Sequence, residues 1–510
     1  MNIIPKATGV KQKDGFFRPA EKLFVRFEKA VEFDIDVFSY RTKGVEFLLS
    51  EEKSDINFVF DPSMQNEGYV LSVKENGVEI RSSSAGGAIY GFATFLQAFD
   101  GEKIPCMEIS DAPRFAYRGI MLDVARHFFG KEVVKELLDE MAFFKLNVFH
   151  WHLTEDQGWR VEIKKYPELA LNACKRNDEQ LNPAGDMAGK PYGEGMYFTQ
   201  DDVREIVEYA SKRNITVIPE IDMPGHITSA LSVFPELSCE GRPLEVSRTF
   251  GIKDTIGCVG NPAFIEFTHD VLDEICELFP APYFHIGGDE VPKAKWKVCP
   301  KCQALMKEKG IKSEDELQGY FTNMTMEYLA SKGKKTIGWN EILDSKELRS
   351  DAIVQWWKGN KPLDWLKKGG KAVLSKCTVC YMDYPYTQTN LQKIYSLGPE
   401  IFKVPADRVQ NVLGIEAPLW TEFVYDKKKF DFLTYPRLQA VAEAAWTAPK
   451  LKCYKDFEKR LQSFLPDMER RGLNYCPPSK YNPVGLKGLR QRIYVAKNIR
   501  RYPDCEEEFK

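Results

Sequence analysis

Two adjacent carboxylates, Asp289 and Glu290, follow a short apolar run that begins at Tyr283 and ends in two glycines. Acidic side chains are rarely buried unless they are paired or take part in chemistry. Because side chains alternate along a strand, both acids can face one pocket only if the strand ends here and Glu290 lies on the following loop. The stretch predicts a catalytic acid pair at the carboxyl end of a barrel strand, and a solvated surface turn is the alternative.

The segments around this pair alternate between strand-like and helix-like patterns from Phe115 onward. Eight βα units of this kind predict an α/β fold, a (β/α)8 TIM barrel over residues 113–450. A doubly wound open sheet is the structural alternative, but it usually carries a Gly-rich phosphate turn after its first strand, and none is present. The predicted strands are Tyr117–Asp123, Asn147–Leu153, Thr216–Ile221, Tyr283–Gly287, Lys335–Trp339, Ala352–Trp357, Lys371–Ser375 and Val412–Ala417.

Shorter segments flank the predicted barrel on both sides. Residues 1–112 are expected to form a small α/β N-terminal domain, because two alternating apolar runs meet at Glu75-Asn76-Gly77, a typical hairpin turn, before a helix-like segment over 85–99. Residues 451–510 predict one amphipathic helix, which carries Phe457 and Leu465, and a tail that packs on the barrel. The basic run Lys487–Arg501 is interpreted as a solvated face.

Composition excludes several classes of protein. The net charge of −3 gives no field that would attract nucleic acid or an anionic membrane, and no apolar run is long enough to span a bilayer. Residues 1–6 lack the pattern of a signal peptide, so we expect a cytoplasmic protein, or an exported one if a signal has been removed. Whether the protein forms a homodimer stays open.

The chain contains twelve cysteines, including two CxxC pairs, Cys299/Cys302 and Cys377/Cys380. Four such cysteines could bind zinc, but these pairs lie much further apart than in a typical zinc ribbon. Free thiols in a reducing compartment are therefore the preferred interpretation, with no metal and no cofactor expected.

Three tryptophans, Trp339, Trp357 and Trp420, lie at or just after the carboxyl ends of predicted strands, where a barrel has its active site. A sugar has an apolar C–H face ringed by hydroxyls, so an aromatic box with charged side chains around it suits a sugar. The pair His150 and His152 raises the alternative of a metal-dependent hydrolase, but no histidine follows His285, so the later strands offer no imidazole ligand. We interpret His150 as a core residue that bonds a carboxylate.

Three motifs, residues 150–160, 219–226 and 285–291, together resemble the family 20 glycoside hydrolases, the β-N-acetylhexosaminidases. The resemblance extends from about Pro113 to Trp446. It implies a retaining exo-β-N-acetylhexosaminidase that releases terminal non-reducing GlcNAc or GalNAc from a glycan. It also implies substrate-assisted hydrolysis through an oxazolinium intermediate, in which the sugar's own acetamido oxygen attacks C1. This agrees with the acid pair, since adjacent residues are poorly placed to flank one bond from opposite faces.

The resemblance also implies individual roles. Glu290 would act as the acid and base, while Asp289 and Tyr381 would hold the acetamido group. The remaining positions would bind the sugar (Trp339, Trp357, Trp420, Arg118, Glu422 and Asp383) or position the acids from behind (His152, Glu155 and His226). Family members usually have two aspartates where this chain has Glu155-Asp156. A sugar-binding protein without catalysis is the alternative from another class.

Overall fold

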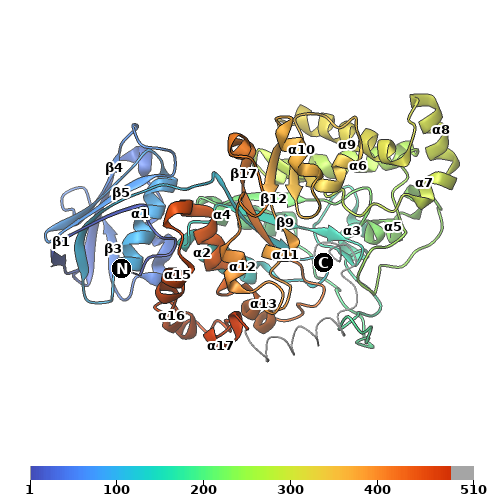
Figure 1. Ribbon diagram of the computed structural model, residues 1–510. Helices are drawn as coiled ribbons and strands as arrows, with labels where there is room; N and C mark the ends of the chain where they lie inside the picture. Colours follow the sequence, from blue (N-terminus) through green and yellow to red (C-terminus); the bar gives the residue numbers. More distant parts are fainter. Residues whose placement is uncertain (1, 484–510) are drawn as a thin grey trace.

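The computed structural model describes residues 2–483, so the basic run Lys487–Arg501 lies outside the described part of the chain (Figure 1). The described residues form a sheet-containing unit at the amino-terminal end, a closed barrel and a short set of helices after the barrel. Among residues 2–483, no helix combines the length and apolar composition needed to cross a membrane.

The first unit is a seven-stranded sheet in the order β1-β7-β5-β6-β4-β2-β3, packed against α1 (Ala85–Ala98). The predicted hairpin is present as the antiparallel pair β5 and β6. Sequence patterns indicated only these two strands. Most residues of β1 are exposed, so this strand lacks the apolar alternation by which a strand is found. The strands are β1 (Gly9–Phe17), β2 (Lys22–Phe27), β3 (Glu46–Leu49), β4 (Ile56–Phe60), β5 (Tyr69–Lys74), β6 (Gly77–Ser82) and β7 (Ile104–Asp111).

The second unit is a closed barrel of eight parallel strands, which confirms the predicted fold class. Every predicted strand is present, and β17 closes the barrel by pairing with β8. All seven residues of β8 are buried, as expected for a parallel strand covered on both faces. The strands are β8 (Tyr117–Asp123), β9 (Val148–His152), β12 (Thr216–Glu220), β13 (Tyr283–His285), β14 (Lys335–Trp339), β15 (Ile353–Trp356), β16 (Lys371–Leu374) and β17 (Val412–Leu419).

Helices separate most of the barrel strands, although β14 and β15 are joined through the 3-10 helix η4 (Asn340–Asp344). The helix α4 begins with the capping box that Thr199 and Asp202 form. The helices from α2 to α14 are α2 (Lys131–Phe143), α3 (Pro167–Leu171), α4 (Gln200–Ser211), α5 (Thr228–Val233), α6 (Pro262–Leu278), α7 (Ala294–Val298), α8 (Pro300–Lys309), α9 (Glu314–Ser331), α10 (Lys361–Lys367), α11 (Cys377–Cys380), α12 (Leu391–Tyr395), α13 (Lys427–Thr434) and α14 (Arg437–Trp446).

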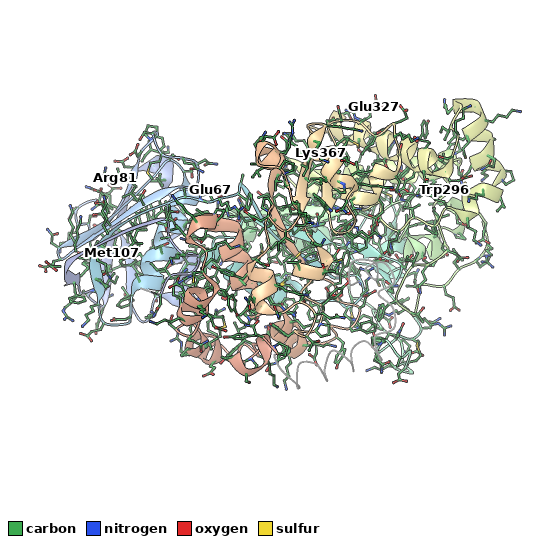
Figure 2. All side chains as sticks on the ribbon, viewed as in Figure 1. Glu67, Arg81, Met107, Trp296, Glu327 and Lys367 are labelled. Carbon is green, nitrogen blue, oxygen red and sulfur yellow. The ribbon has the colours of Figure 1, made fainter. Side chains whose placement is uncertain are left out.

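The small domain packs against the amino end of the barrel strands through buried polar contacts. Lys145 Nζ donates to Tyr69 Oη at 2.8 Å, and Trp446 Nε1–H donates to Asp111 Oδ2 at 2.9 Å. Glu67 lies where the blue sheet domain meets the barrel (Figure 2). A cluster of buried apolar residues lies at the amino ends of the strands: Tyr117, Val148, Ile218, Ile337, Ile353 and Val373. These contacts occupy the amino end, which leaves the carboxyl ends for chemistry.

The segment after the barrel folds into α15 (Tyr454–Leu461), α16 (Leu465–Arg470) and α17 (Pro478–Tyr481). The prediction of one helix across Phe457 and Leu465 is therefore wrong, because the chain breaks between α15 and α16. Pro466 lies in the first turn of α16, where its missing N–H costs nothing, whereas it would interrupt a continuous helix. Arg460 of α15 forms a buried ion pair with Glu443 of α14, at 2.6 Å.

Candidate active site

The acid pair lies on a turn just after β13. The strand ends at His285, and the chain then turns through Gly287, which has φ of 65°. A Cβ at this position would lie 1.9 Å from Asp222 Oδ1, so only glycine fits. Glu290 itself has φ of 50°, an unusual conformation for a residue with a side chain. Such conformations are kept where the surroundings fix them, typically at functional sites.

His226 brings the two carboxylates together. Its Nε2 lies 3.9 Å from Asp289 Oδ2 and 3.6 Å from Glu290 Oε2. His226 follows β12, and its own φ is 48°. Both acids therefore approach one imidazole nitrogen, which places the two carboxyl groups together at the site.

Two further acids lie behind His226. Its Nδ1 is 2.6 Å from Glu155 Oε1 and 3.3 Å from Asp156 Oδ2. Burial opposes the charged imidazole, but these neighbours outweigh it and raise the pKa of His226 well above its ordinary value. Glu155 also forms an ion pair with Arg126. The longer side chain at position 155 therefore contacts both His226 and Arg126.

Asp222 contacts the carboxyl group of Asp289. Burial first, and then the negative charge of Asp289, raise the pKa of Asp222 well above its ordinary value. The raised pKa favours a hydrogen bond from the Asp222 carboxyl group to the Asp289 carboxylate, while Asp222 Oδ1 accepts from the Gly288 N–H at 2.9 Å. The other oxygen of Asp289, Oδ1, is buried and has no hydrogen-bond partner among residues 2–483. The geometry leaves Asp289 an acceptor position for a ligand.

A lysine adds positive charge on another side of the acid pair. Lys358 Nζ lies 4.0 Å from Glu290 Oε1 and 2.9 Å from Glu341 Oε1. Trp357 Nε1–H donates to Glu341 Oε2 at 2.9 Å. Glu341 thus holds the edge of Trp357 and the ammonium of Lys358 together beside Glu290.

Four aromatic rings lie together at the site, and they belong to Tyr381 and to the three tryptophans that the sequence placed at strand ends. The ring centroids of Trp339 and Trp357 are 6.4 Å apart, and those of Trp339 and Trp420 are 5.7 Å apart. The Tyr381 ring is 6.2 Å from Trp357 and 6.3 Å from Trp420. Trp339 is held in place because its Nε1–H donates to Glu220 at 2.8 Å. The box combines apolar ring faces with the acids beside it, which suits a sugar ring.

Charged residues gather beyond Trp420. The Arg126 guanidinium lies 4.9 Å from the centroid of the Trp420 ring. Burial raises the pKa of Glu422, although the charge of Arg126 opposes this effect. Burial and the charge of Glu422 also raise the pKa of Asp383 well above its ordinary value. Arg126, Asp383 and Glu422 therefore form one polar group at the site.

Arg118 does not lie in this group, so the prediction that it binds the sugar is wrong. It is the second residue of β8, at the amino end of the barrel, and it is fully buried. Its Nη1 pairs with Glu67 Oε2 at 2.8 Å, and its Nη2 donates to Tyr90 Oη at 3.1 Å. Arg118 therefore joins the barrel to the small domain. Arg126, which follows the carboxyl end of β8, is the arginine of the site.

The histidines of β9 belong to a buried network within the barrel. His150 Nδ1 lies 2.9 Å from Glu416 and its Nε2 lies 3.0 Å from Glu220, which confirms that it is a core residue bonding carboxylates. His152 Nδ1 is 2.5 Å from Glu220, and its ring packs edge-on against Trp420 at 5.0 Å. His152 thus supports the aromatic box, whereas the prediction placed it behind the acids.

Sequence reasoning missed four residues that the geometry brings to the site: Arg126, Asp222, Glu341 and Lys358. Arg126, Asp222 and Glu341 closely follow the ends of predicted strands, but only their positions in space show what they contact. Lys358 follows Trp357 directly, and nothing in its sequence context distinguishes it from a solvated lysine.

Known proteins with a similar sequence agree with this geometry. Residues 115–449 match the profile of "Glycosyl hydrolase family 20, catalytic domain", and residues 1–112 match "Glycosyl hydrolase family 20, domain 2". A β-hexosaminidase from Porphyromonas gingivalis is 40% identical over 83% of this chain, which spans 56% of that protein's length. A β-hexosaminidase from Akkermansia muciniphila is 34% identical over 80% of this chain and 87% of its own length.

Solved structures give the same result. A family 20 exo-β-N-acetylglucosaminidase from Vibrio harveyi, determined with N-acetylglucosamine, superposes with a TM-score of 0.84 at 32% identity and covers 94% of this chain and 79% of its own. A β-N-acetylhexosaminidase from Bacteroides fragilis superposes with a TM-score of 0.83 at 29% identity and covers 94% of this chain and 99% of its own. By its sequence and by its fold, this chain belongs to glycosyl hydrolase family 20.

Proposed function

We propose that this chain is a retaining exo-β-N-acetylhexosaminidase that releases terminal GlcNAc or GalNAc from a glycan by substrate-assisted hydrolysis. One observation carries the proposal: Asp289 and Glu290 both approach His226 Nε2, at 3.9 and 3.6 Å. An enzyme that uses its own nucleophile needs two carboxyl groups about 5–5.5 Å apart that flank the glycosidic bond. Asp289 and Glu290 are adjacent residues on one turn after β13, so they are poorly placed to flank the bond, and this fits a reaction in which the substrate provides the nucleophile.

In the first step Glu290 protonates the oxygen of the leaving group while the C1–O bond breaks. The acetamido oxygen of the same sugar forms a new bond to C1, which gives the oxazolinium ion. Asp289 accepts a hydrogen bond from the acetamido N–H, so its negative charge stabilises the cation. Asp222 holds Asp289 in position for this role, because its carboxyl O–H donates a hydrogen bond to that carboxylate.

In the second step water attacks C1 and the bond between C1 and the acetamido oxygen breaks. Glu290, now a carboxylate, takes the proton from the water, which restores the acid for the next turnover. Each step inverts C1, so the product retains the β configuration. The protonated His226 and the ammonium of Lys358, at 3.6 and 4.0 Å, stabilise the carboxylate form of Glu290 that this step needs.

The aromatic box places the sugar for both steps. Trp339, Trp357 and Trp420 provide the apolar faces, and the Tyr381 hydroxyl donates to the acetamido carbonyl. Holding the acetamido oxygen against C1 converts an unfavourable encounter into an intramolecular reaction, which is where much of the rate enhancement would come from. The hydroxyls of the sugar face the group formed by Arg126, Glu422 and Asp383, which gives the site a polar end and makes the action exo.

The experiment compares 4-nitrophenyl β-glycosides of GlcNAc and of glucose, which lacks the acetamido group. We expect hydrolysis of the first compound only, and we expect Asp289→Asn to lower kcat on it by about 10²–10⁴-fold. Glu290→Gln should fall in the same range on a glycoside with a poor leaving group. The exposed Glu347→Gln is the matched control and should keep the wild-type rate. Equal rates on both glycosides would show a protein nucleophile, and binding of a thiazoline mimic without hydrolysis of any hexosaminide would indicate a sugar-binding protein.

A further inference from the structure

Four cysteines from distant parts of the sequence converge at one point of the structure. Cys258 Sγ lies 3.6 Å from Cys299 Sγ and 3.7 Å from Cys302 Sγ, and Cys239 Sγ lies 3.8 Å from Cys302 Sγ. All four sulfur atoms lie within 4.8 Å of one another. Three of these cysteines are buried and Cys239 is half-buried. The two CxxC pairs of the sequence are separate in the structure, which places Cys299 and Cys302 with Cys239 and Cys258.

The spacing of the sulfur atoms matches a tetrahedral metal site. Zinc bound to four thiolates has Zn–S bonds of about 2.3 Å, which places the sulfur atoms about 3.8 Å apart. A disulfide needs about 2.05 Å, so the observed distances do not describe two disulfides. An iron–sulfur cluster would spread its cysteines more widely than this group, because the cluster's own atoms separate them. A single ion fits the observed distances.

The backbone around the cluster is built to hold these positions. Ser238 and Gly257 form an antiparallel bridge, so the neighbouring Cys239 and Cys258 come from paired segments. Cys299 is the cap residue of α8 and Cys302 lies in its first turn. A Cβ on Gly260 would lie 2.3 Å from the backbone of Lys301, so this loop packs directly on the CxxC turn. The two halves of the cluster are therefore in contact even without an ion.

Charge and chemistry both favour metal binding. Two of the sulfur atoms lie at the amino end of a ten-residue helix, whose dipole stabilises thiolates. A set of four sulfur ligands in tetrahedral arrangement selects zinc or iron over the hard cations. Because all four positions are filled by protein, the site has no open position for water or substrate. Such closed sites are structural.

We propose that Cys239, Cys258, Cys299 and Cys302 bind one Zn²⁺ as a structural site. On binding, the four thiols lose four protons and form four Zn–S bonds, with no change of oxidation state. The ion joins the loop after β12 to the segment that runs from the acid pair to α8. Trp296, at the end of the molecule far from the small domain, joins the same two segments because its Nε1–H donates to Gly257 O at 3.0 Å (Figure 2). The zinc would thus fix the far end of the loop that carries Asp289 and Glu290.

The second CxxC pair provides an internal control. Cys377 and Cys380 belong to the short helix α11. The Cys380 thiol donates to Lys376 O at 3.2 Å and lies 3.4 Å from Glu416 O. A serine hydroxyl can make the same hydrogen bonds, so Cys380→Ser removes a CxxC thiol without touching the proposed site.

The first measurement is the metal content of the full chain, purified in reductant without added metal from cells supplied with zinc and iron. We expect about one zinc per chain by mass spectrometry of the metals, and release of that zinc by about four equivalents of a mercurial thiol reagent. This measurement needs no variant, so it does not depend on how well a mutant folds. Less than about 0.1 zinc per chain, one iron per chain, or a mass that shows two disulfides would overturn the proposal.

Variants then test which residues hold the ion. Cys258→Ser and Cys302→Ser should lower the zinc content from about one to below about 0.1 per chain, while Cys380→Ser should keep it. Cys239→His should retain zinc, since imidazole replaces thiolate in many structural sites. Zinc that stays at full content in Cys258→Ser and Cys302→Ser would place the ion elsewhere, for instance at the acids and imidazoles of the active site, and would overturn the assignment.

Discussion

The barrel holds two clusters of carboxylates and imidazoles that share the same strands but differ in how their atoms are partnered. The inner network consists of Glu220 and Glu416 with the side chains that surround them: Tyr117, His150, His152, His285, Trp339 and Gln355. The outer cluster consists of the acid pair and its neighbours at the mouth: Asp222, His226, Asp289, Glu290, Glu341 and Lys358.

The two clusters differ in backbone conformation and in how fully their carboxylate oxygens are hydrogen-bonded. Glu220 and Glu416 sit on regular strands, and several donors surround each carboxylate, so nothing remains to react. In the outer cluster both His226 and Glu290 have positive φ, and Asp289 Oδ1 lacks a partner among residues 2–483. The comparison teaches that a carboxylate beside a histidine is not by itself catalytic. The reactive cluster is the one with strained backbone and an Asp289 carboxylate oxygen that no described residue bonds.

Breaking the inner network should affect stability more than chemistry. His150→Leu leaves Glu220 and Glu416 facing each other without the cation between them, and removing one partner of a buried ion pair costs about 3–5 kcal/mol of unfolding free energy. Chemical denaturation at neutral pH measures this loss. The half-buried His269→Leu is the control and should cost much less. A variant as stable as the wild type would show that the network contributes nothing to folding.

The protonation of His150 also leads to a prediction of how the free energy of unfolding depends on pH. Burial opposes the charged form of His150, but Glu416 and Glu220 outweigh it and raise its pKa to about 10. The folded state therefore binds this proton more tightly than the unfolded state, whose pKa is about 6.5. The contribution is fully present below about pH 6.5 and is lost as the pH rises through about 10. The difference in unfolding free energy between wild type and His150→Leu should accordingly shrink across this window, and a constant difference would argue against a charged His150.

Two arginines, Arg118 in β8 and Arg126 just after it, allow a structural charge to be compared with a charge at the active site. Arg126→Lys removes the planar guanidinium that faces Glu155 and Trp420 at the site, and the loss of a charge-assisted hydrogen bond to the sugar costs about 1.5–3 kcal/mol. We therefore expect kcat/KM on the GlcNAc glycoside to fall by about 10- to 150-fold. Arg118→Lys should lower the melting temperature through its contacts with Glu67 and Tyr90 and leave KM near the wild-type value. The opposite pattern would restore Arg118 to the sugar site.

Sequence alone predicted the barrel well for a physical reason. Parallel strands buried on both faces are continuous apolar runs, as β8 is, and such runs are visible without any partner. The exposed strand β1 has no such signature and was missed. The acids were found because their motif is local. The resemblance led to the prediction of Arg118, although the rule that chemistry lies at the carboxyl ends of strands favours Arg126.

Contacts between separate loops could not be predicted from the sequence. Cys239 and Cys258 have no CxxC spacing, and they meet Cys299 only because two loops after neighbouring strands fold onto each other. Lys358 reaches Glu290 through the turn after β15, which no periodicity describes. Site residues within a local motif can be predicted from the sequence. Site residues that a separate loop brings into contact can be identified only from the three-dimensional structure.

The smallest expected effect concerns Glu155, which touches both His226 and Arg126. Shortening it in Glu155→Asp withdraws the carboxylate from His226 Nδ1, now at 2.6 Å, while Asp156 stays at 3.3 Å. The pKa of His226 should fall because its first counter-charge has moved away, and Glu155→Gln should lower it further because the charge is gone. The first step needs Glu290 in its protonated form, and a weaker imidazolium favours this form, so the alkaline limb of kcat/KM should move to higher pH, by less than about one unit in Glu155→Asp. The exposed Glu168→Gln on α3 should leave the profile unchanged. An alkaline limb at the wild-type position in both variants at 155 would show that His226 does not set it, and that the outer cluster acts through Lys358 instead.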